Sequence, residues 1–145
     1  MTMTAQEMAE ACAKAMWDLD VASQDLGMRI DHIAPGEATL SMEITAKMSN
    51  GHGNCHGGYI FTLADSALAF ACNGYNQVTV AQNCSITYVS PGRIGDRLTA
   101  EAREVARTGR SGIYDVFVSD PDGNLVAAFR GLSRTVNGKH LPETA

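Results

Sequence analysis

The chain has 145 residues, a common size for one domain with its own core. Hydrophobic residues make up 45% and charged residues 19%, which is ordinary for a folded soluble protein. The net charge of -5 disfavours binding to a nucleic-acid backbone, and no segment approaches the roughly 20 apolar residues that span a bilayer. We therefore expect neither nucleic acid nor a membrane among the partners.

The expected elements begin with an N-terminal helical extension over residues 1–20. Thr4 and Glu7 are spaced as a capping box, and apolar residues follow them at helical intervals to about residue 19. The segment lacks the basic stretch and apolar run of a secretion signal. Apolar and polar residues then alternate from about 28 to 44, which predicts two antiparallel strands around a turn at 34–36.

A glycine-rich loop over residues 50–58 leads into a long apolar helix over 59–73. After Gly74 the period changes to two, and four strands are expected, at 78–89, 98–106, 113–118 and 125–136. A single long helix among strands joined by short turns is typical of an antiparallel sheet with that helix on one face. We predict one α+β domain over residues 1–145, with a curved sheet around the helix; a four-stranded sheet with two free hairpins is the alternative.

Asp65 is the only charged residue in the long helix, which is apolar on every side and is therefore expected to be buried all round. Burying a lone carboxylate costs on the order of several kcal/mol, and this segment contains no Lys or Arg to pair with it. Asp65 could bond to nearby backbone or reach solvent. Buried ionisable groups nevertheless concentrate where chemistry takes place, so Asp65 is the candidate catalytic carboxylate.

Gly57 and Gly58 precede this helix, where backbone N–H groups point outward and the helix dipole favours negative charge. A carbonyl polarised there would have its developing oxyanion stabilised by backbone N–H groups. The pair could also simply permit a tight turn into the helix. Combined with a single acid inside the helix, the pair indicates an oxyanion site.

A set of short motifs extends from about residue 27 to the end of the chain. They are Asn50-Gly51-His52, Cys55-His56-Gly57-Gly58, Leu63-Ala64-Asp65, Ala69-Phe70-Ala71-Cys72-Asn73, Ser90-Pro91-Gly92, Gly95-Asp96 and Phe129-Arg130-Gly131. In combination they resemble the hotdog acyl-CoA thioesterases, and among these the phenylacetate-pathway branch. The resemblance implies a hotdog fold, paired dimers and usually tetramers.

The resemblance also implies roles for individual residues. The Gly57 amide would bind the thioester oxygen, and Asp65 would attack the carbonyl carbon or activate water. Asn50 matches a polar position that orients water or the carboxylate, and His56 matches the histidine that precedes the oxyanion glycine. A related branch has a hydroxyl one helical turn beyond the acid, but Ala69 stands there in this chain, so that role is not transferred.

Coenzyme A carries phosphates, so an acidic protein must gather cations locally to bind it. Arg93 lies near Gly95, and the turn at residues 109–112 resembles the part of the family that meets the phosphopantetheine arm. Each arginine could instead be a solvated charge at a strand end. The candidate substrate-binding residues are Gly58, Arg93, Arg110, Ser111 and Gly112.

His52, Cys55 and His56 could suggest a zinc site or a cysteine nucleophile, but no second ligand pair or partner base accompanies them. We therefore expect no metal and no cofactor. The four cysteines have neither disulfide-framework spacing nor a C-x-x-C motif, which indicates reduced thiols and a cytoplasmic location.

These features predict hydrolysis of acyl-CoA to free CoA and a carboxylate, with an aryl or arylacetyl substrate such as phenylacetyl-CoA or a hydroxylated derivative. A hotdog dehydratase that moves protons with His56 and Asp65 is one alternative. A non-catalytic acyl-CoA binding module is another, and it would need the pocket but not the buried acid.

Helix geometry predicts that each active site is shared between two chains. Gly57 and Asp65 are eight residues apart, which is roughly 12 Å along one helix at about 1.5 Å per residue. Reacting atoms must approach to about 3–3.5 Å. An antiparallel helix from a twofold partner would bring its Asp65 to this chain's Gly57, so we expect a homodimer with two equivalent sites.

Overall fold

The computed structural model describes residues 2–143. The helices are α1 (Ala5–Trp17), α2 (Val21–Asp25) and α3 (Gly57–Cys72), with one 3-10 turn, η1 (Ala46–Met48). The strands are β1 (Arg29–Ala34), β2 (Glu37–Glu43), β3 (Thr79–Tyr88), β4 (Arg97–Thr108), β5 (Ser111–Ser119) and β6 (Leu125–Thr135). All six pair antiparallel in one sheet, in the order β1-β2-β4-β5-β6-β3.

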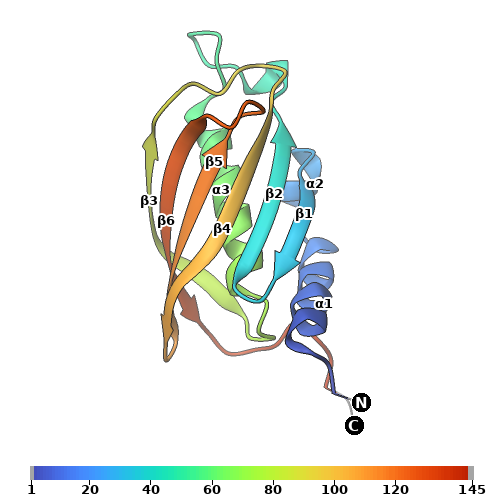
Figure 1. Ribbon diagram of the computed structural model, residues 1–145. Coiled ribbons are helices and arrows are strands. Elements are labelled where there is room, and N and C mark those ends of the chain that lie inside the picture. Colours follow the sequence, from blue (N-terminus) through green and yellow to red (C-terminus); the bar gives the residue numbers. More distant parts are fainter. Residues whose placement is uncertain (1, 144–145) are drawn as a thin grey trace.

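Figure 1 shows this sheet curving around α3, with α1 and α2 beyond its β1 edge. The predicted curved antiparallel sheet around one long helix is therefore confirmed, and the alternative with two free hairpins is wrong. Sequence reasoning missed α2, because five residues are too few to show a helical period. It also began α3 two residues late, since the helix starts at Gly57 behind a histidine cap.

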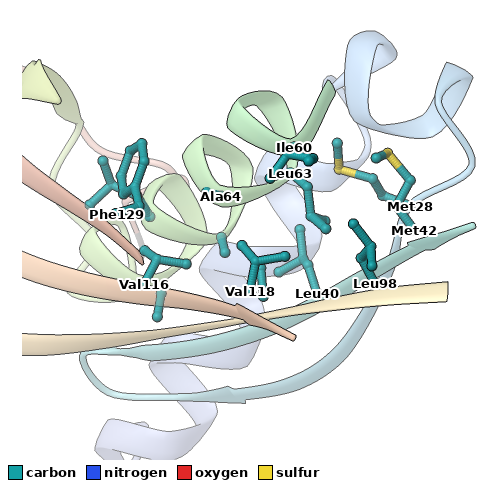
Figure 2. Close-up of a cluster of buried hydrophobic side chains, with 14 of the residues drawn as sticks. Met28, Leu40, Met42, Ile60, Leu63, Ala64, Leu98, Val116, Val118 and Phe129 are labelled. Atoms are coloured by element: carbon teal, nitrogen blue, oxygen red, sulfur yellow. The ribbon is translucent and has the colours of Figure 1, made fainter. Parts of the chain in front are cut away.

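The core lies between α3 and the concave face of the sheet. Small side chains on α3, such as Ala64 and Ala67, let its backbone come close to the strands, and both are fully buried. Figure 2 shows Ile60 and Leu63 of α3 above the apolar side chains that the sheet contributes, among them Leu40, Leu98, Val116 and Val118. Each fully buried Leu or Val contributes roughly 1.5–3 kcal/mol, so this layer fixes where α3 lies.

One contact between α3 and the sheet requires glycine. A Cβ at Gly131 of β6 would lie 2.5 Å from Cδ2 of Leu68 on α3, closer than real contacts allow. The absent side chain at Gly131 therefore lets Leu68 pack directly against β6, three residues beyond Asp65 on α3.

The N-terminal extension docks on the same helix from the other side. Trp17 packs against Phe70 of α3 with ring centroids 6.1 Å apart. Asp20 accepts hydrogen bonds from the backbone N–H and the hydroxyl of Ser23, and the Ser23 and Ser66 hydroxyls lie 2.8 Å apart. This chain of hydrogen bonds connects α2 to the residue that follows Asp65.

The expectation that α3 is buried all round is wrong for a single chain. Phe61, Thr62, Asp65 and Ala69 form a stripe along one side of α3 that is only partly buried. The edge strand β3 is likewise open, and Val80 is 46% exposed. One chain therefore does not bury all of the apolar surface of α3. No helix within residues 2–143 is long and apolar enough to cross a membrane.

Candidate active site

A cavity of about 450 Å³ opens at the start of α3, at the end of the molecule drawn uppermost in Figure 1. Its walls come from the loop at residues 50–55, the first turn of α3 and the segment at residues 88–92. It brings together Asn50 and Gly57, two of the residues predicted for catalysis, and adds Tyr88 of β3. Asp65 does not line it.

Gly57 presents a free backbone donor to this region. The side chain of His56 caps α3, with its Nδ1 accepting the Gly58 N–H at 3.0 Å, and the Tyr59 N–H donates to the His56 carbonyl oxygen at 3.0 Å. Within residues 2–143 the Gly57 N–H has no hydrogen-bond acceptor. The start of α3 therefore offers one uncommitted N–H where the helix dipole favours negative charge.

Asn50 organises the loop beside Gly57. Its Oδ1 accepts the backbone N–H groups of His52 at 2.9 Å and Asn54 at 3.1 Å. That oxygen is thereby committed to the loop, and the amide NH2 group remains available for a ligand. Any contact of Asn50 with a ligand would therefore use its amide NH2 group as a donor.

Asp65 lies in the middle of α3, half-buried within the exposed stripe described above. Among the described residues its carboxylate has no hydrogen bond and no ion pair. Burial raises the pKa of this carboxyl above its ordinary value. At roughly 12 Å along the helix from Gly57, it does not reach the same carbonyl group from within one chain.

The predicted substrate-binding residues lie at both ends of the molecule. Arg93 is next to the cavity, since its backbone bridges to Asn54. Arg110 and Ser111 lie in the β4–β5 hairpin, at the opposite end of the sheet (Figure 1). Packing alone explains a glycine at position 112, because a Cβ there would lie 2.7 Å from the Ser133 hydroxyl oxygen. One chain therefore does not bring the hairpin to the Gly57 cavity.

A second cavity, of about 440 Å³, lies beside that hairpin between Tyr75 and Arg107. The Arg107 guanidinium stacks over the Tyr75 ring at 3.5 Å from its centroid. Glu104 accepts the hydroxyls of Tyr75 and Tyr114, each at 2.9 Å. Glu104 continues the inward-facing alternation of Leu98, Ala100 and Ala102, and a β-bulge interrupts the pairing only after it.

Tyr88 is the site residue that sequence reasoning missed. It ends β3, donates its hydroxyl to the Gly57 carbonyl oxygen at 2.9 Å and lines the cavity. The only signal in the sequence is its place just before the Ser90-Pro91 turn, which by itself indicates no contact with α3.

The cysteines have no catalytic geometry in the described chain. All four are free thiols, as their spacing predicted. Cys55 is buried in the cavity wall, and burial raises its pKa to about 11. Its thiol stays protonated near neutral pH, so it packs and does not act as a nucleophile.

With this geometry in view, comparisons with known proteins give a consistent result. The family profile described as Thioesterase superfamily matches residues 52–127. The acyl-coenzyme A thioesterase PaaI of Escherichia coli is 40% identical over 126 residues, which covers 87% of this chain and 90% of that protein. A putative esterase of Archaeoglobus fulgidus is 32% identical over 141 residues, covering 97% of this chain and 92% of its own.

Solved structures agree with the sequence matches. The PaaI protein from the phenylacetic acid degradation operon of E. coli superposes with a TM-score of 0.92 at 38% identity, covering 94% of this chain and 99% of that one. The smu.793 protein of Streptococcus mutans, solved with bound acetyl CoA, gives 0.74 at 26% identity, with coverage of 77% and 90%. The resemblance drawn from the motifs is confirmed: the chain has the hotdog fold and belongs to the thioesterase superfamily.

Proposed function

We propose that this protein hydrolyses acyl-CoA thioesters, with aryl and arylacetyl groups as its substrates. The observation that carries the proposal is the uncommitted Gly57 N–H at the start of α3, beside a cavity of about 450 Å³. Acyl transfer needs such a donor where negative charge develops on the carbonyl oxygen. The family membership and the name of the E. coli relative support the same reaction.

In the proposed mechanism the thioester oxygen accepts the Gly57 N–H, and Asp65 of the partner subunit faces the carbonyl carbon. Asp65 either takes a proton from a water that attacks this carbon or attacks it directly to form an anhydride that water then opens. In both routes the carbon–sulfur bond breaks, and the products are free CoA and a carboxylate. The Asn50 amide would orient the water or the carboxylate.

A shared site is supported by two features of the single chain. Asp65 has no bonding partner within the described residues, although burial already disfavours its charge. The stripe that contains Asp65 lies on a helix side that one chain leaves partly open, and the neighbouring edge strand β3 is open too. A twofold partner would cover both, and we propose a dimer that pairs further into a tetramer.

The same arrangement accommodates the residues at the far hairpin. If α3 of the partner runs antiparallel, its β4–β5 hairpin approaches this chain's cavity. Arg110, Ser111 and Gly112 of one chain and Arg93 and Gly58 of the other would then meet one CoA molecule. Four free thiols support a reducing, cytoplasmic location for the enzyme.

A thiol-release assay over a panel of acyl-CoAs at constant pH tests the function. We expect the highest kcat/KM for phenylacetyl-CoA or a hydroxylated derivative, with aliphatic chains lower. Binding of these compounds without thiol release would instead identify a non-catalytic module. Conversion of a 3-hydroxyacyl-CoA to its enoyl product without thiol release would identify a dehydratase.

A further inference from the structure

The first turn of α3 is held by two side chains that lie outside the helix. The Tyr88 hydroxyl donates to the Gly57 carbonyl oxygen at 2.9 Å, and His56 Nδ1 accepts the Gly58 N–H at 3.0 Å. Both bonded atoms belong to one peptide unit, the one that joins Gly57 to Gly58. This peptide is therefore fixed at its oxygen by β3 and at its nitrogen by the residue before the helix.

The Tyr88 ring adds a steric restraint. A Cβ at Gly57 would meet three atoms of Tyr88 at 3.0–3.2 Å, so the ring lies directly against the Gly57 backbone. Two successive glycines at a helix start have more backbone freedom than any other pair. The ring and the two hydrogen bonds remove that freedom where it would let the Gly57 N–H turn away.

Burial in the core does not explain this contact. Tyr88 is 49% exposed, so it contributes little to the apolar interior. Its hydroxyl also serves a carbonyl that already lies in the first helical turn, where the i+4 amide can reach it. The bond is therefore additional to what the helix requires, and it acts on the peptide next to the free Gly57 N–H.

We propose that Tyr88 is a positioning residue for the Gly57 amide. By holding the Gly57–Gly58 peptide, it keeps the Gly57 N–H directed at the place where the thioester oxygen becomes an oxyanion. This inference rests on the proposed function. Donors that are already oriented when the reaction begins need no reorganisation, and their effect is on kcat more than on substrate affinity.

Tyr88→Phe tests the inference, because it keeps the ring and removes only the hydroxyl. We expect kcat to fall by about three- to tenfold, a fraction of the loss from deleting an oxyanion donor, while KM stays within about twofold. The melting temperature should be unchanged. The matched control is Tyr59→Phe on the same helix, whose hydroxyl makes no hydrogen bond within the described residues, and it should keep the wild-type kcat.

A second measurement does not depend on turnover. In the ¹⁵N-labelled protein, Tyr88→Phe should speed hydrogen exchange at the Gly58 amide at least about threefold, since the peptide loses one of two anchors. Tyr59→Phe should not. Full kcat in Tyr88→Phe, a raised KM with unchanged kcat, or unchanged Gly58 exchange would each overturn the positioning role. A wild-type protein that releases no thiol from any acyl-CoA would refute the proposed function instead, and the exchange result would remain interpretable.

Discussion

The first turn of α3 and the middle of the same helix differ in how completely one chain satisfies them. At the first turn, His56 and Tyr88 bond both ends of the Gly57–Gly58 peptide. In the middle, Asp65 is half-buried and has no bonding partner within residues 2–143. A single chain thus supplies hydrogen-bond partners for the helix start that would receive the oxyanion. It supplies none for the carboxylate that would attack the carbonyl carbon. A half-buried polar group without a hydrogen-bond partner is a candidate for contact with a second chain and a substrate.

The sharpest way to break this comparison is to remove the charge of Asp65. Asp65→Asn should lower kcat by at least about a hundredfold, the usual scale for a positioned acid–base group, while the fold and assembly persist. Steady-state thiol release and size-exclusion chromatography measure the two effects. Asp25→Asn makes the same change at an exposed residue of α2 and should leave turnover intact. Near wild-type turnover in Asp65→Asn would end the catalytic assignment.

Mixing two inactive variants tests whether the two halves come from different chains. Gly57→Leu should be inactive because its side chain collides with Tyr88 and displaces the amide. Refolded together with Asp65→Asn, it should regain activity, since each mixed dimer has one site with both native groups. Random pairing predicts activity at roughly a quarter of all sites. If mass spectrometry finds mixed dimers and the mixture stays inactive, each site lies within one chain.

The pH dependence of turnover examines the environment of Asp65. In the proposed mechanism the ionised form of Asp65 is the active one. We therefore expect kcat/KM to fall as the pH drops through the pKa of Asp65, which burial raises above the ordinary aspartate value. The raised pKa also affects stability. Ionised Asp65 lowers the free energy of unfolding at neutral pH, and this loss disappears as the pH falls below the pKa of Asp65 in the unfolded chain. Asp65→Asn should therefore melt no lower than wild type at pH 7. An acid limb at or below the ordinary aspartate pKa would contradict this.

The smallest effect is expected at the cap of α3. His56→Ala removes the acceptor for the Gly58 N–H and should lower the free energy of unfolding by about 0.5–2 kcal/mol, as measured by urea titration. His56→Asn restores an acceptor at a position where Asn is a favoured cap and should recover most of the loss. Equal stability of the two variants would show that the histidine cap is dispensable.

The sequence was informative where local patterns decide the structure. Alternation placed the six strands, and the isolation of Asp65 in an apolar segment singled it out before any contact was known. The position of Tyr88 could not be inferred, because its hydroxyl meets Gly57 only after β3 folds back alongside α3. The bulge between Glu104 and Ala106 was not predicted either, because one extra residue in a strand leaves no compositional trace.

The placement of Arg110 was within reach of sequence reasoning. Successive antiparallel strands reverse direction, so the turns on either side of β4 must lie at opposite ends of the sheet. Counting strands would have separated Arg110 from Arg93 without any coordinates. A family resemblance grouped them by role, whereas topology divides them between the two ends of each chain.

The contact between Leu68 and Gly131 affects which positions saturation mutagenesis of this protein would identify as intolerant to substitution. A Cβ at Gly131 would lie 2.5 Å from the buried Leu68 side chain, so either Leu68 or α3 must shift, and we expect most substitutions there to be harmful. Such an experiment would score Gly131 beside Asp65 and Gly57, although it lies under the helix on the sheet and touches neither the cavity nor the carboxylate. Intolerance to mutation in this fold therefore identifies positions that pack against α3 as well as catalytic residues. Variants that lose turnover but keep their melting temperature distinguish the catalytic residues from the packing ones.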